Sequence, residues 1–118
     1  MQINRLDHLV LTVAGIESSA GFDTRILGMQ KQVFEGGRRA VKFRAHQDNL
    51  HQAGREFEPK ALRPTPRSAD LCRISVEPLN RVIAELASHG VEIEEGPVEQ
   101  AEAIGRSSAS TSVTRTRT

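Results

Sequence analysis

The chain has 118 residues, which is enough for one domain with a modest hydrophobic core. Its 16 Lys and Arg nearly balance its 15 Asp and Glu, so the formal net charge of +1 argues against nucleic acid or an anionic membrane as a partner. The single cysteine, Cys72, cannot form an internal disulfide, and the longest apolar stretch, residues 9–16, is too short to span a bilayer. We therefore expect a cytoplasmic protein.

The sequence contains two similar units. Residues 7–13, a helical stretch and Gly28 are echoed by residues 70–76, a second helical stretch and Gly90. The offset is 63 residues at the strand-like segments and 62 at the glycines. Such an echo predicts a duplicated strand-helix-strand arrangement.

The first unit begins with an alternating segment, residues 4–13, in which Leu9, Leu11 and Val13 share one face of a predicted strand. Apolar residues then recur at helical spacing as far as Gly28, which provides a common helix end. Gly36 and Gly37 predict a tight hairpin turn. The remaining predicted strands of this unit are residues 29–34, 38–45 and 48–52.

The second unit follows a polar segment, residues 53–67, whose three prolines prevent a continuous strand or helix. Residues 69–76 form a predicted strand with Cys72 on its apolar face, so we expect this thiol to be buried. Pro78 suits the first position of a helix that ends at Gly90. Its apolar stripe consists of Leu79, Val82, Ile83 and Leu86, and a strand is expected at residues 91–95.

The end of the sequence does not continue this pattern. Eight of the thirteen residues from Arg106 to Thr118 are Ser or Thr, which bury too little apolar surface to offset the entropy of ordering. We expect residues 106–118 to be disordered. The expected single domain therefore covers residues 1–105 and comprises a first module, 1–54, a linker, 55–67, and a truncated second module, 68–105.

Four segments resemble the vicinal oxygen chelate superfamily, which includes glyoxalase I, bleomycin-resistance and fosfomycin-resistance proteins, and extradiol dioxygenases. These segments are LDHLVLTV at residues 6–13, RILGM at 25–29, NLHQAG at 49–54 and SADL at 68–71. The resemblance implies an α+β fold of paired βαβββ modules, here with the second module truncated at its C-terminal strands. It also implies a small-molecule substrate, a homodimer, and a divalent metal ion that would be Zn, Ni, Mn or Fe.

The same resemblance implies where the site lies. Carried over by position, His8 and His51 would be two metal ligands, whereas Leu71 stands at the matching position of the second module and cannot bind a metal. The family's usual glutamate on the final strand has no counterpart. Lys42 and Arg73 are weaker candidates for a substrate cleft, with a solvent-exposed strand face as the alternative, and no catalytic residue is assigned.

A change of reading frame would account for the unusual end of the sequence. The segment from Gly105 can be back-translated so that the frame two bases later encodes PILSVYFRDPDANL, which is similar to the family's usual final strands. Three functions remain open at this point: a metal-dependent enzyme, either a glyoxalase-like lyase or isomerase or a ring-cleaving dioxygenase; a metal-free sequestering protein of the bleomycin-resistance type; and a nonfunctional frameshifted remnant.

Overall fold

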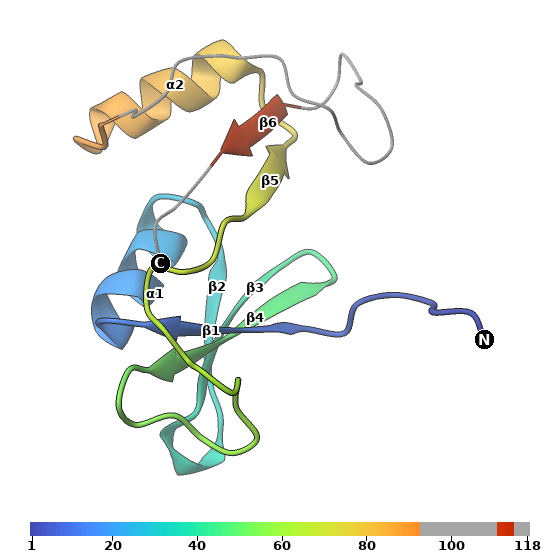
Figure 1. The fold of residues 1–118 in the computed structure, drawn as a ribbon. Coiled ribbons are helices and arrows are strands. Elements are labelled where there is room, and N and C mark those ends of the chain that lie inside the picture. Colours follow the sequence, from blue (N-terminus) through green and yellow to red (C-terminus); the bar gives the residue numbers. More distant parts are fainter. Residues whose placement is uncertain (93–110, 115–118) are drawn as a thin grey trace. The chain divides into compact units, whose positions relative to one another are not determined.

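The computed structural model describes residues 1–92 and 111–114. The chain divides into two compact units at the junction of Ala69 and Asp70 (Figure 1). Within the described ranges, no helix combines the length and the apolar character needed to cross a bilayer. The fold class is α+β, as predicted.

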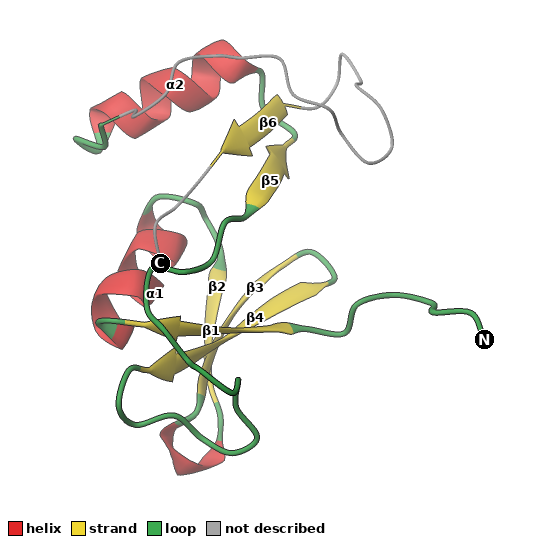
Figure 2. Cartoon of the chain, viewed as in Figure 1, coloured by secondary structure: helices red, strands yellow, loops and turns green. Residues whose placement is uncertain are grey.

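The first unit is a βαβββ module built on a four-stranded mixed sheet (Figures 1 and 2). Its sheet order is β1-β4-β3-β2, with β1 parallel to β4 and the other neighbours antiparallel. The elements are β1 (Leu9–Val13), α1 (Ile16–Arg25), β2 (Gln30–Val33), the 3-10 turn η1 (Glu35–Gly37), β3 (Arg39–Phe43) and β4 (His46–Gln52).

The core of this unit lies between α1 and one face of the sheet. Leu11, Val13, Val41 and Leu50 are buried on that face, and Ala20 is buried on the helix. The strand register explains why they meet, since Leu11 lies opposite Leu50 and successive residues of a strand alternate between faces. Burying side chains of this size stabilises the fold by about 1.5–3 kcal/mol each.

An ion-pair cluster joins α1 to the same face. The carboxylate of Glu17 pairs with Arg39 on β3 and with Lys31 on β2, whose Nζ lies 3.5 Å away. Gln52 fixes the start of the helix, because its Oε1 accepts a hydrogen bond from the Ile16 amide and its Nε2 donates to the Ala14 carbonyl. Helix α1 is thus held to the sheet at its first turn.

The predicted hairpin between β2 and β3 is confirmed. Gly36 and Gly37 have φ angles of 78° and 80°, which residues with a Cβ atom rarely adopt. Strand boundaries differ from the prediction: β1 begins at Leu9 rather than residue 4, β3 ends at Phe43 rather than residue 45, and β4 begins at His46 rather than Asp48, while β2 and the start of β3 differ by one residue. The pairing of β1 with β4 starts at Leu9 opposite Asp48, so the residues before Leu9 lie outside the ladder.

The second unit contains β5 (Cys72–Ser75), α2 (Leu79–Ser88) and β6 (Thr111–Thr114), with β5 and β6 antiparallel. The expectation that Cys72 is buried is wrong. Cys72 and Ile74 are both exposed, because a two-stranded sheet cannot enclose the residues on its faces.

The end of the chain also differs from the prediction at four residues. Thr111–Thr114 form β6, although residues 106–118 were expected to be disordered. Thr and Val are β-branched residues, which favour extended backbone. The expectation of disorder considered only the low apolar content of the segment. The rest of that range lies outside the described residues. So does most of the strand expected at 91–95, whose first two residues are not in a strand.

Candidate functional site

The sheet of the first unit has a second, more polar face on the side opposite α1, called here the opposite face. Side chains alternate between faces along each strand, and the pairing register shows which residues of the four strands lie on this face. Its members are Val10 and Thr12 on β1, Gln30 and Gln32 on β2, Ala40 and Lys42 on β3, and Gln47, Asn49 and His51 on β4. This face offers polar side chains for binding, whereas the α1 face is used for the core.

His51 is a buried polar residue of this face. It is 8% exposed, and its Nδ1 has no hydrogen-bond partner among the described residues. The Phe57 ring packs edge-on against the imidazole with 6.0 Å between the ring centroids, and the guanidinium of Arg38 lies over Phe57, 4.7 Å from its centroid. Burial and the Arg38 charge lower the pKa of His51, with Glu56 opposing them, so the imidazole is held neutral.

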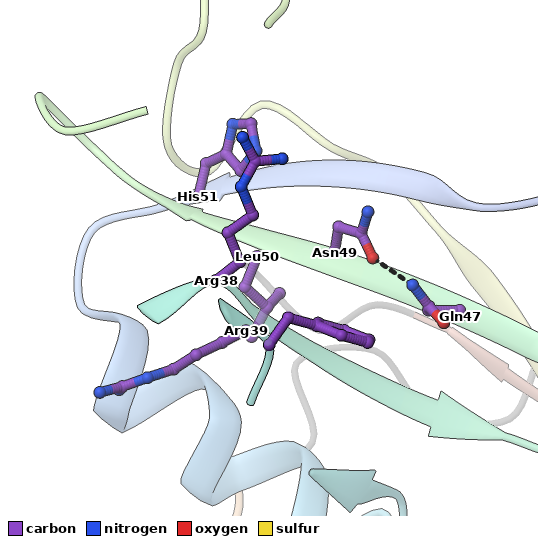
Figure 3. A pocket seen from close by; sticks show the side chains of 7 residues that line it. Arg38, Arg39, Gln47, Asn49, Leu50 and His51 are labelled. Carbon is purple, nitrogen blue, oxygen red and sulfur yellow. Dashed lines mark hydrogen bonds between the residues drawn. The ribbon is translucent and has the colours of Figure 1, made fainter. Parts of the chain in front are cut away.

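A pocket of about 240 Å³ opens beside His51 (Figure 3). Arg38 and His51 lie together at one end, and Asn49 and Gln47 lie toward the other, joined by a hydrogen bond of 2.5 Å from Gln47 Nε2 to Asn49 Oδ1. Arg39 extends away from them, and its guanidinium pairs with Glu17. The lining residues are Phe34, Arg38, Arg39, Gln47, Asn49, Leu50 and His51.

His8, the other predicted metal ligand, lies in a different environment. It immediately precedes β1, its side chain is 41% exposed, and its Nδ1 lies 2.8 Å from Asp7 Oδ2. The hydrogen bond from His8 lowers the pKa of Asp7. A carboxylate that accepts from one ring nitrogen leaves the other nitrogen available, which is the arrangement common for metal-bound histidines.

The structure does not bring His8 and His51 together. His51 pairs with Thr12, which is four residues from His8, and four residues of extended chain span about 13 Å. Two imidazoles that share a zinc ion must hold their nitrogens within about 4 Å of each other, given metal–nitrogen bonds of about 2 Å. Within residues 1–92 and 111–114, no three His, Cys, Asp or Glu side chains form a group that could hold a metal. The described residues therefore do not fit a metal centre by themselves.

The two weaker cleft candidates lie in different units. Lys42 is on the opposite face, paired with Gln47 on one side and Gln30 on the other, but it does not line the pocket. Arg73 is on β5 of the second unit, where it lies opposite Val113. A role for either side chain in binding stays a prediction.

Sequence reasoning missed the residues that surround His51. Asn49 lies in the predicted strand 48–52 and alternation places it on the face of His51, whereas Gln47 could have been found only by extending that strand toward its start. Arg38 and Phe57 gave no periodic signal, because Arg38 precedes β3 and Phe57 lies in the segment after β4. Their contact with His51 depends on how the chain folds back after the strand.

Two related proteins match most of the length of this chain. Virulence protein STM3117 of Salmonella typhimurium is 50% identical over 105 residues, which cover 89% of this chain and 73% of that protein. Glyoxalase domain-containing protein RDO1 of Mycosarcoma maydis is 42% identical over 105 residues. That match covers 89% of this chain but only 59% of the Mycosarcoma protein, so this chain spans less than two thirds of its length.

Two solved structures also match over most of this chain. The crystal structure of virulence protein STM3117 matches with a TM-score of 0.86 and 46% identity over 97% of this chain and 86% of that one. An integron cassette protein from the mobile metagenome of V. cholerae matches with a TM-score of 0.85 and 43% identity, over 97% of this chain and 84% of that one.

The sequence model of one family matches residues 5–103, which is most of the chain. The βαβββ topology of the first unit is the arrangement that the resemblance to this family implied. The chain belongs to the Glyoxalase/Bleomycin resistance protein/Dioxygenase superfamily.

Proposed function

We propose that this protein binds a small organic molecule in the pocket beside His51, in the manner of a metal-free bleomycin-resistance protein. The observation that carries the proposal is His51 itself, a buried imidazole whose Nδ1 has no hydrogen-bond partner among the described residues and which lines a pocket. A buried polar atom without a partner costs about 1–3 kcal/mol. A ligand that supplied further hydrogen bonds at this end of the pocket would recover part of that cost.

The composition of the pocket supports small-molecule binding. Phe34 provides exposed apolar surface, while Arg38, Asn49 and His51 provide polar groups that can fix an orientation. A volume of about 240 Å³ is below the range of about 300–1,000 Å³ that is usual for drug-sized ligands. The proposed ligand is therefore small, with few polar groups.

The test is a fragment screen by amide-shift NMR on the protein in a chelating buffer. We expect the fragments that bind to shift the backbone amides of Arg38, Asn49 and His51. The variant His51→Phe fills the site with an apolar ring and should lose these shifts. Fragment shifts centred on other residues, or unchanged binding to His51→Phe, would contradict the proposal.

A second candidate function is the metal-dependent one, a glyoxalase-like lyase or isomerase or a ring-cleaving dioxygenase. The hydrogen bond between Asp7 and His8 favours it, because it orients His8 as second-shell carboxylates orient metal-bound histidines. Calorimetric titration of Zn, Ni, Mn or Fe(II) into the protein and into His8→Ala and His51→Ala tests it. We expect only His8→Ala to weaken binding, since the register separates the two histidines.

Three further expectations stay predictions. A homodimer is checked by light scattering during size-exclusion chromatography, and a cytoplasmic location by cell fractionation. The family match ends at residue 103, so residues 106–118 are outside it. Sequencing the coding DNA across Gly105 decides between the frameshift and an ordinary reading of that segment.

A further inference from the structure

The charge of the pocket beside His51 indicates which class of molecule it takes. Two cationic side chains, Arg38 and Arg39, are among the seven described lining residues, and none of the seven is acidic. Arg39 is neutralised locally by Glu17 on the α1 side. Arg38 is exposed, and its guanidinium lies on the Phe57 ring beside His51. Arg38 is therefore the cation that a ligand in the pocket would meet.

The neutral polar groups present hydrogen-bond donors. Asn49 Oδ1 accepts a hydrogen bond from Gln47 and keeps one lone pair, while its amide nitrogen can offer N–H donors to a ligand. A neutral imidazole always carries one N–H. With the guanidinium of Arg38, which presents a planar fork of N–H groups, the pocket is richer in donors than in acceptors. A ligand with acceptor oxygens fits such a set.

The apolar lining restricts the remainder of the ligand. Phe34 and Leu50 line the pocket with Asn49, and Phe57 lies at the Arg38 end in contact with His51. Aromatic rings prefer stacked or edge-to-face neighbours at about 4.5–7 Å between centroids. A flat, partly apolar body is therefore favoured over a highly charged one.

We propose that the ligand is a small aromatic or unsaturated monocarboxylate whose carboxylate is bound by Arg38. This inference rests on the proposed function. The planar guanidinium matches a carboxylate with two parallel hydrogen bonds, which an ammonium cannot do. His51 lies at the same end of the pocket as Arg38 and can add a hydrogen bond, Asn49 lies toward the other end (Figure 3), and Phe34 contacts the apolar body of the ligand.

The experiment uses benzoate as the probe and benzamide as its uncharged counterpart, with amide-shift NMR and calorimetry on the full chain. We expect benzoate to bind more tightly than benzamide. Arg38→Gln should weaken benzoate binding about tenfold or more, because the loss of even one of the two charge-assisted hydrogen bonds costs about that factor, and leave benzamide binding unchanged. Arg38→Lys should restore less than half of the loss, because it returns the charge without the fork.

Arg63→Gln is the control. It removes one positive charge from an exposed residue of the first unit that does not line the pocket, so benzoate affinity should stay within a factor of two. Equal binding of benzoate and benzamide in the pocket would overturn the carboxylate assignment and leave the proposed function standing. If other fragments shift the amides of Asn49 and His51 but neither probe does, the ligand class is wrong. If no fragment shifts these amides, the pocket is not a binding site and both proposals fail.

Discussion

The neutral state of His51 predicts a particular dependence of stability on pH. Burial and the charge of Arg38 lower the pKa of this imidazole in the folded protein from its ordinary value of 6.5. As the pH falls below about 6.5, the unfolded chain takes up a proton that the folded chain does not. The free energy of unfolding therefore decreases as the pH falls from about 6.5 to the lowered pKa of the native state. Above pH 6.5 the neutral imidazole makes its full contribution to stability.

The size of this effect is bounded by the uptake of one proton. The slope cannot exceed about 1.4 kcal/mol per pH unit for a single group. His51→Gln removes the titrating group, so its free energy of unfolding should fall less steeply below about pH 6.5 than that of the original chain. Arg38→Gln removes one cause of the lowered pKa and should give an intermediate slope.

Urea denaturation between about pH 5.5 and pH 8 measures this slope. His46→Gln is the control, because it removes an exposed imidazole from the same strand, β4. The reasoning is refuted if His51→Gln and the original chain lose stability in parallel on acidification. It is also refuted if His46→Gln removes as much of the slope as His51→Gln does.

Three other predictions concern packing and exposure. Leu50→Ala should lower the free energy of unfolding by about 2–5 kcal/mol, because Leu50 is 1% exposed, whereas Leu62→Ala, at a residue 97% exposed, should change it by less than about 0.5 kcal/mol in urea denaturation. Glu17→Gln removes the ion pairs from α1 to the sheet and should cost at most about 1 kcal/mol by the same measurement, since Glu17 is largely exposed; a larger loss would show that the pairs are more than a surface contribution. Cys72 should react with a thiol reagent in the native protein as fast as in urea, and protection in the native state would contradict its exposure.

Local signals in the sequence were sufficient to predict the order of strands and helix in the first module. Alternation of Leu9, Leu11 and Val13 identified β1, and the glycine pair identified the hairpin before β3, because each depends only on neighbouring residues. These signals did not predict the pairing of strands, in which β1 lies parallel to β4 across more than thirty intervening residues. Long-range pairing carries no local signature, so propensity alone could not have given it.

The candidate site was predicted only in part. His51 lines the pocket, as a site residue should. Its neighbours Arg38 and Phe57 come from irregular segments, one just before β3 and the other after β4. The burial of Cys72 was inferred from the apolar character of its strand face, yet burial depends on what covers that face, which a single strand's sequence does not contain. The errors thus lie where a property depends on a second segment of chain.

Strand register explains why the two predicted histidine ligands have different chemistry. On adjacent parallel strands, side chains of one face meet only within about one register position, so the neighbours of His51 on β1 are Thr12 and its vicinity, and His8 is beyond reach. Asn49, opposite Val10, lies closer to His8 than His51 does. His8 is exposed, oriented by Asp7 and open at its second nitrogen, which suits a ligand to an ion completed by other groups. His51 is buried, neutral and beside a cation, which suits a hydrogen bond to an organic molecule. Similarity by sequence position groups the two residues, but the register separates them, and experiments on this protein should treat them as two sites.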